Sequence, residues 1–183
     1  MDNHTTWAPP QTPGTGKARQ GLLKLDMDLV DRIVEGCHEG LSMADIKPPA
    51  IGASRLVNLA RPYAVIVGLV GEDSGSMTMG LSGEAALFMV NSLMGTQSTR
   101  IEDEELDALM EIGNITAGCV RNKLVDMHYN INNISLPALV LGANYHVHQS
   151  KGVKTCSVEF ELEELPVHLY RERFFTVSVS LRR

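Results

Sequence analysis

The sequence predicts an α+β fold in which an antiparallel or mixed sheet packs against long helices. Apolar residues recur at helical spacing in two long segments, 26–43 and 102–126, and short runs rich in β-branched residues lie between turn residues elsewhere. The chain has 183 residues, of which 44% are hydrophobic and 21% charged, a composition typical of one globular domain. We therefore expect residues 23–183 to form one domain and residues 1–22, rich in Pro, Thr and Gly, to form a disordered or extended tail.

The first half of the chain contains two helix signals with a hairpin between them. In order, we expect a helix at 26–43, a strand at 64–70, a turn at 72–75, a strand at 76–81 and a helix at 83–94. Pro48 and Pro49 end the helical tendency of the first segment. Ser82 is a good N-cap for the second helix and Gly95 a good stop.

The second half opens with the longest proline-free helix signal and continues with strands. Four acidic residues, Glu102 to Glu105, begin the helix, where negative charge suits the helix dipole. Strands are expected at 134–141, 145–149, 153–162 and 173–181. Pro137 marks the first of these as an edge strand or the site of a bulge. Glu159, Glu161, Glu163 and Glu164 are interpreted as an acidic strand edge, a solvated face that discourages aggregation. No clean internal duplication is expected, although two hairpin-plus-helix segments are weakly similar.

Charge and cysteine usage exclude some classes of function. The formal net charge of −6 argues against sequence-independent binding to nucleic acid, because that binding depends on Lys and Arg neutralising phosphates. No run of about 18 apolar residues that could cross a membrane is present, and the N-terminus does not resemble a secretory signal. The three cysteines, Cys37, Cys119 and Cys156, form no CxxC pair. We expect a cytoplasmic protein with free thiols, acting on protein partners and not on nucleic acid or membranes.

A helical wheel of residues 106–125 separates an apolar stripe from a polar face. The stripe predicted to be buried consists of Leu106, Leu109, Met110, Gly113, Ala117, Val120 and Leu124. The neighbouring arc carries Asp107, Glu111, Asn114, Gly118 and Arg121, and Glu111 and Asn114 project side by side because they are three residues apart. Polar helix residues are usually just solvated surface. The spacing alone therefore leaves open whether this face is functional.

A longer pattern surrounds that pair. Asp107, three residues, Glu111, two residues and Asn114 are followed after 22 further residues by Pro137. This pattern resembles the signature of the CheC/CheX/FliY phosphatases, and the continuation Asn-Ile-Thr-Ala-Gly is similar to that family as well. The 65–81 hairpin and the helix that follows it resemble the segment that precedes the signature in CheX proteins. The likeness covers about residues 25–183, and a single signature copy in a chain of this size resembles CheX, because CheC commonly carries two.

The resemblance implies a CheC/CheX-like sandwich and a role in chemotaxis or other two-component signalling. Its activity would be hydrolysis of the aspartyl phosphate on a CheY-like response regulator. Asn114 would position the attacking water and Glu111 would dock to the receiver. Asp107 would contact the receiver, orient this pair or only favour the start of the helix, and Gly118 would permit close docking or serve helix packing. No cofactor is expected in this chain, since the receiver domain would supply the divalent metal (Mg). A homodimer formed through the sheets is also implied.

Other interpretations of the sequence remain open. The chain could be an adaptor that binds a response regulator without catalysis, although an adaptor has no need of the Asn114 carboxamide. It could also be an assembly protein with an incidental polar face. His146 and His148 alternate on an expected strand, but no Cys, Asp or Glu completes a metal site nearby in the sequence. We therefore expect no metal site in this chain.

Overall fold

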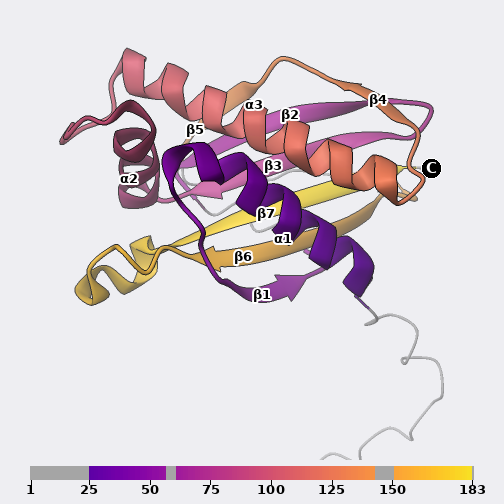
Figure 1. The fold of residues 1–183 in the computed structure, drawn as a ribbon, viewed down its shortest axis with the longest axis horizontal. Coiled ribbons are helices and arrows are strands. Elements are labelled where there is room, and N and C mark those ends of the chain that lie inside the picture. The colour runs from indigo at the N-terminus through magenta and orange to yellow at the C-terminus, as the bar shows by residue number, and fades with distance from the viewer. Residues whose placement is uncertain (1–24, 57–60, 143–150, 183) are drawn as a thin grey trace, which may run out of the picture.

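The structure is a computed structural model that describes residues 25–56, 61–142 and 151–182. These residues form an antiparallel sheet whose one face is covered by two long helices lying side by side (Figure 1). The helices are α1 (Met27–Leu41), α2 (Gly83–Met94) and α3 (Asp103–Asp126), with short 3-10 helices η1 (Ser42–Ala44) and η2 (Val167–Glu172). The strands are β1 (Ala50–Ser54), β2 (Tyr63–Gly71), β3 (Ser74–Leu81), β4 (Ile131–Ile134), β5 (Ala138–Leu141), β6 (Lys154–Glu161) and β7 (Phe174–Arg182). The predicted α+β class is confirmed, and every described strand pair is antiparallel.

The sheet order reveals an internal duplication that the sequence did not make evident. The order is β1-β6-β7-β3-β2-β4, with β5 also paired to β2. Each half of the chain supplies a long helix, an outer strand or strand pair, and a pair of inner strands: α1, β1, β2 and β3 first, then α3, β4 with β5, β6 and β7. The two halves meet where β3 pairs with β7 in the middle of the sheet. The expectation of no clean duplication was therefore wrong at the level of topology, because the repeat is in the order of the elements.

The two long helices approach each other closely because α1 carries glycines where they meet. A Cβ atom built on Gly36 would lie 2.6 Å from the Val120 Cα, and one built on Gly40 would lie 2.6 Å from the Thr116 Cα. No ordinary side chain fits at those distances, so the two glycines permit the contact. An ion pair of 2.8 Å between Glu39 and Lys123 links the same helices. Both helices are thereby held in one fixed arrangement over the sheet.

Side-chain hydrogen bonds, in addition to the helix dipole, stabilise the start of α3. Glu102 and Glu105 form a capping box, in which each side chain accepts a hydrogen bond from the other residue's backbone N–H. The Glu105 carboxylate also accepts a bond of 2.6 Å from the Ser98 hydroxyl, and these hydrogen bonds lower its pKa. Glu105 is nearly buried as a result, although it lies in the expected acidic cluster. The helix that carries the polar face therefore begins at a defined point.

Most predicted elements are confirmed, with three differences. Ser82 caps α2 by accepting a 3.0 Å hydrogen bond from the Ala85 N–H, and Gly95 ends the helix in the left-handed conformation. Strand β1 was not predicted, because its five exposed residues lack a β-branched or alternating pattern. The single strand expected at 134–141 is two strands, β4 and β5, separated at Pro137 along one side of β2. The short helix η2 was also missed.

Two predictions concern residues that the structure does not describe. The N-terminal tail assigned to residues 1–22 lies outside the described residues. The strand expected at 145–149, with His146 and His148, lies outside them as well.

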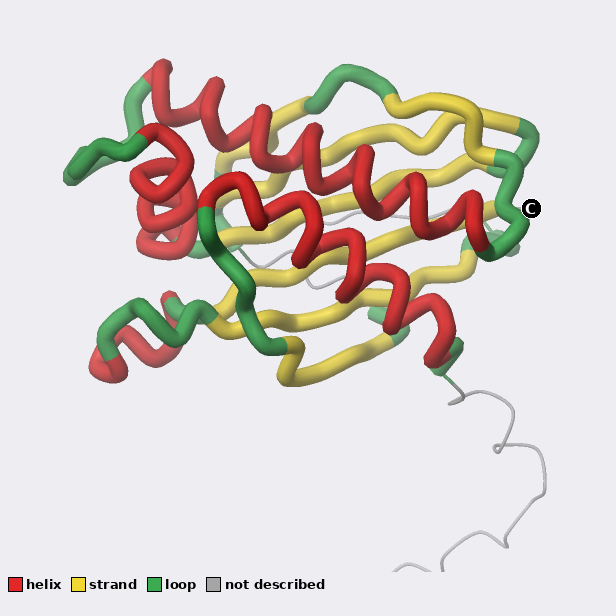
Figure 2. The backbone as a smooth tube through the Cα atoms, in the orientation of Figure 1, coloured by secondary structure: helices red, strands yellow, loops and turns green. Residues whose placement is uncertain are grey.

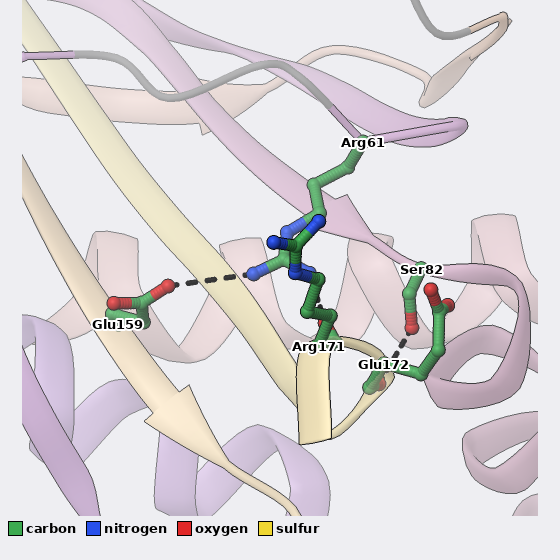
Figure 3. A network of polar contacts seen from close by, with 5 residues as sticks. All are labelled: Arg61, Ser82, Glu159, Arg171 and Glu172. Atoms are coloured by element: carbon green, nitrogen blue, oxygen red, sulfur yellow. Dashed lines mark hydrogen bonds and ion pairs between the residues drawn. The ribbon is translucent and has the colours of Figure 1, made fainter. Parts of the chain in front are cut away.

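The acidic strand edge is a wrong interpretation for Glu159 and Glu161, because they lie in β6, an interior strand between β1 and β7, whereas Glu163 and Glu164 are exposed in the turn after it. Figure 3 shows Arg61 reaching toward Glu159 across the sheet, with 3.4 Å between its Nη2 and the carboxylate. Arg61 Nη1 donates a 2.9 Å bond to the Arg171 carbonyl, and Glu161 pairs with Arg173 at 2.8 Å. Nearby, the Ser82 hydroxyl donates to the Glu172 carbonyl at 2.6 Å (Figure 3). Glu159 and Glu161 are therefore paired with arginines, and the side chains of Arg61 and Ser82 tie the backbone of η2 to the sheet and to the start of α2.

The three cysteines are free thiols in the structure. Cys37 and Cys156 are buried and Cys119 is half-buried on α3. Burial raises the pKa of Cys37 and raises the pKa of Cys156 to about 11, so both thiols stay protonated at neutral pH.

Among the described residues, no helix combines the length and the hydropathy that crossing a membrane requires.

Candidate functional site

The candidate site lies on the flank of α3 that faces away from α1. The buried residues of α3 contact α1 and the sheet; they are Glu105, Leu109, Ile112, Gly113, Thr116, Ala117, Val120 and Leu124. This stripe is rotated toward α1 relative to the prediction. Ile112 and Thr116 are buried, whereas Leu106 and Met110 are only half-buried. The rotation has a physical cause, because α3 packs against a second helix as well as against the sheet.

The four predicted site residues share this outer flank. Asp107 and Glu111 are exposed, and Asn114 and Gly118 are half-buried. They follow one another at spacings of three and four residues along a continuous helix, so they form one row. The Glu111 carboxylate and the Asn114 carboxamide form no hydrogen bond or ion pair with the described part of the chain. Both groups are therefore available to a partner, on a helix whose other faces are fixed.

The outer strands β4 and β5 border the row of site residues. Arg121, the last residue of the predicted polar arc, donates hydrogen bonds of 2.9 Å to the Ile131 carbonyl and 2.7 Å to the Asn132 carbonyl. One turn earlier on the helix, the position of a Cβ on Gly118 would be 4.0 Å from Cδ1 of Ile134. Figure 2 shows the connection between β4 and β5 running past the middle of α3. The site therefore lies where the outer flank of α3 meets the edge of the sheet.

The two glycines of α3 have different surroundings. A Cβ on Gly113 would overlap Cγ1 of Val65 and would lie 2.9 Å from Cβ of the same residue, which is fully buried in β2. Gly113 is thus required for packing the helix on the sheet, as the sequence predicted for this position. A Cβ on Gly118 would make only the ordinary contact with Ile134. Packing among the described residues therefore gives no reason for the glycine at 118.

The signature proline lies in a bulge of the sheet edge. Between β4 and β5, the Ser135 N–H donates to the Gly68 carbonyl at 2.9 Å and the Ser135 hydroxyl accepts from the Gly68 N–H at 2.8 Å. Ser135 thus completes the hydrogen bonds of β2 where the ladder is interrupted. Pro137 is half-buried and follows the exposed Leu136. The predicted bulge at Pro137 is confirmed.

Helix α1 carries the related pattern Asp31, Glu35 and His38, each 76 positions before Asp107, Glu111 and Asn114. The same shift relates buried positions of the two helices: Leu29 to Glu105, Ile33 to Leu109, Gly36 to Ile112, Cys37 to Gly113, Gly40 to Thr116 and Leu41 to Ala117.

Glu35 and His38 of α1, unlike Glu111 and Asn114 of α3, are already engaged. Glu35 pairs with Arg32 at 2.7 Å, and His38 Nε2 lies 2.8 Å from the Pro48 carbonyl oxygen. Sequence reasoning missed this second row, although comparing the two long helices at one fixed shift would have found it.

No histidine, cysteine or acidic groups among the described residues are clustered so that they could hold a metal ion.

The fold of this chain is shared with proteins of the CheC and CheX class. A CheC-like superfamily protein from Shewanella sp. PV-4 superposes with a TM-score of 0.71 at 18% identity, covering 87% of this chain and 100% of that one. The Borrelia burgdorferi structure of a CheX-CheY-BeF3-Mg²⁺ complex includes a chain that matches with a TM-score of 0.63 at 23% identity, covering 85% of this chain and 98% of that one. The CheY-P phosphatase CheX of Thermotoga maritima is 25% identical over 162 residues, which are 86% of this chain and 98% of that protein.

The sequence model of the family described as chemotaxis phosphatase CheX matches residues 63–161. This match covers more than half of the chain and includes α3 with its row of site residues. The chain therefore belongs to the CheX family of chemotaxis phosphatases, which are hydrolases. The predicted resemblance is confirmed, while the roles of individual residues are the subject of the proposal below.

Proposed function

We propose that this protein hydrolyses the aspartyl phosphate of a CheY-like response regulator in the cytoplasm, with Asn114 positioning the attacking water and Glu111 docking to the receiver domain. The observation that carries the proposal is the pair of unengaged side chains on the outer flank of α3. Membership of a phosphatase family supports the reaction class. A relative with the same fold has been solved with CheY, BeF3 and Mg²⁺, which supports the partner.

The chemistry asks little of the phosphatase beyond placing a water molecule. An acyl phosphate is already reactive, and in-line attack by water depends on positioning and on neutralising phosphate charge. A carboxamide can donate to or accept from water without adding negative charge beside the phosphate. Asn114 meets this requirement, and its half-buried position on a fixed helix limits the ways in which it can move.

Glu111 serves as the docking group in this proposal. A carboxylate next to an anionic phosphate is a poor general base, but it pairs well with a lysine of the receiver's active site. Since Glu111 lies almost one turn before Asn114 on the same flank, its ion pair would fix the depth at which Asn114 enters. We assign Asp107, one turn earlier, and Gly118, one turn later, to the same contact surface. The divalent metal belongs to the receiver and not to this chain.

The activity is tested by following decay of a phosphorylated CheY-type receiver from the same organism. The rate constant is expected to rise with phosphatase concentration and to saturate with receiver concentration. Binding without faster decay would instead identify an adaptor on a phosphatase fold. Neither binding nor faster decay with any cognate receiver would contradict the proposal.

We also propose that the protein is a homodimer, as its family resemblance implies. The C-terminal strands β6 and β7 are interior strands, so the free strand edges of the described sheet belong to β1 and to β4 with β5. Light scattering is expected to give twice the chain mass of 20.0 kDa at micromolar concentration. A mass equal to one chain would contradict the dimer and would leave the proposed activity untouched.

A further inference from the structure

Leu136 is the most exposed large hydrophobic side chain of the described residues. Its exposed fraction is 90%, whereas the other large apolar side chains of the described chain reach 75% at most. The residue lies in the connection between β4 and β5, in a polar stretch that begins with Asn132, Asn133 and Ser135. A single exposed leucine is ordinary on a protein surface. Its location and its rigid support distinguish Leu136 from the others.

The location follows from the course of the sheet edge past α3. Arg121 bonds to Ile131 and Asn132, and Gly118 faces Ile134, so the strand runs opposite to the helix. A helix rises about 1.5 Å per residue and a strand about 3.3 Å. The step of four residues from Gly118 back to Asn114 therefore covers about the same length as two residues of the strand edge after Ile134. Residues 136 and 137 therefore lie about level with Asn114. An exposed apolar residue of the strand edge thus lies at about the same height along α3 as the proposed water-positioning group.

The support comes from the residues on each side of Leu136. The Ser135 hydroxyl accepts from the Gly68 N–H and donates to the Leu136 carbonyl at 2.8 Å, which ties the connection to β2. Pro137 restricts the preceding residue to an extended backbone. Leu136 is consequently displayed at a defined place without contributing to the core. Pro137, the proline of the family signature, therefore helps to fix the position of Leu136 in this chain.

We infer that Leu136 is a hydrophobic docking residue for the apolar surface of the receiver beside its phosphorylated aspartate. The inference rests on the proposed function and extends the docking surface from α3 to the sheet edge. Three features support the receiver as the occupant: continuity with the row Glu111–Asn114–Gly118, the room for a side chain at Gly118 among the described residues, and the hydrogen-bonded backbone at Ser135 and Leu136. Burial of this leucine would strengthen binding without taking part in the chemical step.

The test separates KM from kcat in the dephosphorylation assay. Leu136→Ala is expected to raise KM about tenfold and Leu136→Asp more, with kcat within about twofold of wild type. Pro137→Ala, which frees the backbone at Leu136, should give a smaller rise in KM. Leu56→Ala is the matched control, since Leu56 is 75% exposed beyond β1 at the opposite edge of the sheet. It is expected to leave both constants unchanged.

Two results would overturn the inference while the proposed function stands. One is a wild-type KM for both Leu136 variants in a preparation that accelerates decay. The other is a change from dimer to monomer in Leu136→Asp with unaltered KM, which would assign the residue to a second copy of the chain. If the wild-type protein does not accelerate decay, the proposed function is contradicted and KM cannot test the docking role of Leu136. Affinity for a receiver activated with beryllofluoride, measured for Leu136→Ala and Leu56→Ala, then shows independently whether this edge binds it.

Discussion

Asn114→Ala is expected to reduce the accelerated decay of the phosphorylated receiver about 100-fold, because loss of a positioned water costs roughly that factor. The reason is geometric: the methyl group of alanine can neither donate to nor accept from water. Asn114 is half-buried and bonds to no described residue, so its removal should not weaken the fold. Alanine is also the better helix former, so the thermal midpoint should stay the same or rise slightly. The measurement is the saturating decay rate, with circular dichroism as the check on folding.

Glu111→Ala provides the contrast that separates the two proposed roles. It should weaken binding to the beryllofluoride-activated receiver, whereas Asn114→Ala should bind with nearly wild-type affinity. Asn122→Ala is the matched control for Asn114. It removes an exposed asparagine of the same flank about two turns further along α3, whose carboxamide oxygen already accepts a 3.0 Å bond from Arg121, and it should leave decay and binding unchanged. Full activity in Asn114→Ala would contradict the assignment of the carboxamide. Equal loss of binding in both variants would show that they form one docking surface without separate tasks.

The sequence was sufficient to predict the helix, the row of site residues and the central hairpin. Each of these depends on local signals: the acidic start of α3, spacings of three and four residues, and the turn after β2. The position of the row on an open flank also follows from the wheel, because polar side chains avoid the core.

What the sequence did not reveal depends on contacts between distant segments. The rotation of the buried stripe comes from the packing of α1 on α3, through Gly36 and Gly40, which no local pattern indicates. Strand β1 was missed because it gains its structure from pairing with β6 and not from its own residues. The glutamates of β6 looked like a free edge because their arginine partners, Arg61 and Arg173, lie elsewhere in the sequence. The duplication is visible only once the sheet order is known.

Gly113→Ala and Gly118→Ala are expected to have opposite effects on stability, and only Gly118→Ala is expected to change KM. At 113, the new methyl group would overlap the side chain of Val65 inside the core, and such overpacking costs about 1–3 kcal/mol of unfolding free energy. At 118 nothing opposes it, and replacing a helix glycine by alanine gains about 0.5–1 kcal/mol. Denaturant unfolding of the two variants measures both changes. Gly113→Ala should be less stable than wild type, and Gly118→Ala more stable.

The activity of Gly118→Ala then decides why a glycine is present where packing does not require one. If bare backbone at this position admits the receiver, the more stable variant should have a higher KM, by about tenfold, since a buried methyl clash costs roughly 1–3 kcal/mol. A stabilised variant with lower efficiency is the result that close docking requires. Wild-type kinetics in Gly118→Ala would contradict that role, and the receiver would then contact the row only at Glu111 and Asn114. Because Gly113→Ala alters packing and not the outer flank, its remaining folded fraction should keep a wild-type KM, which separates loss of fold from loss of docking.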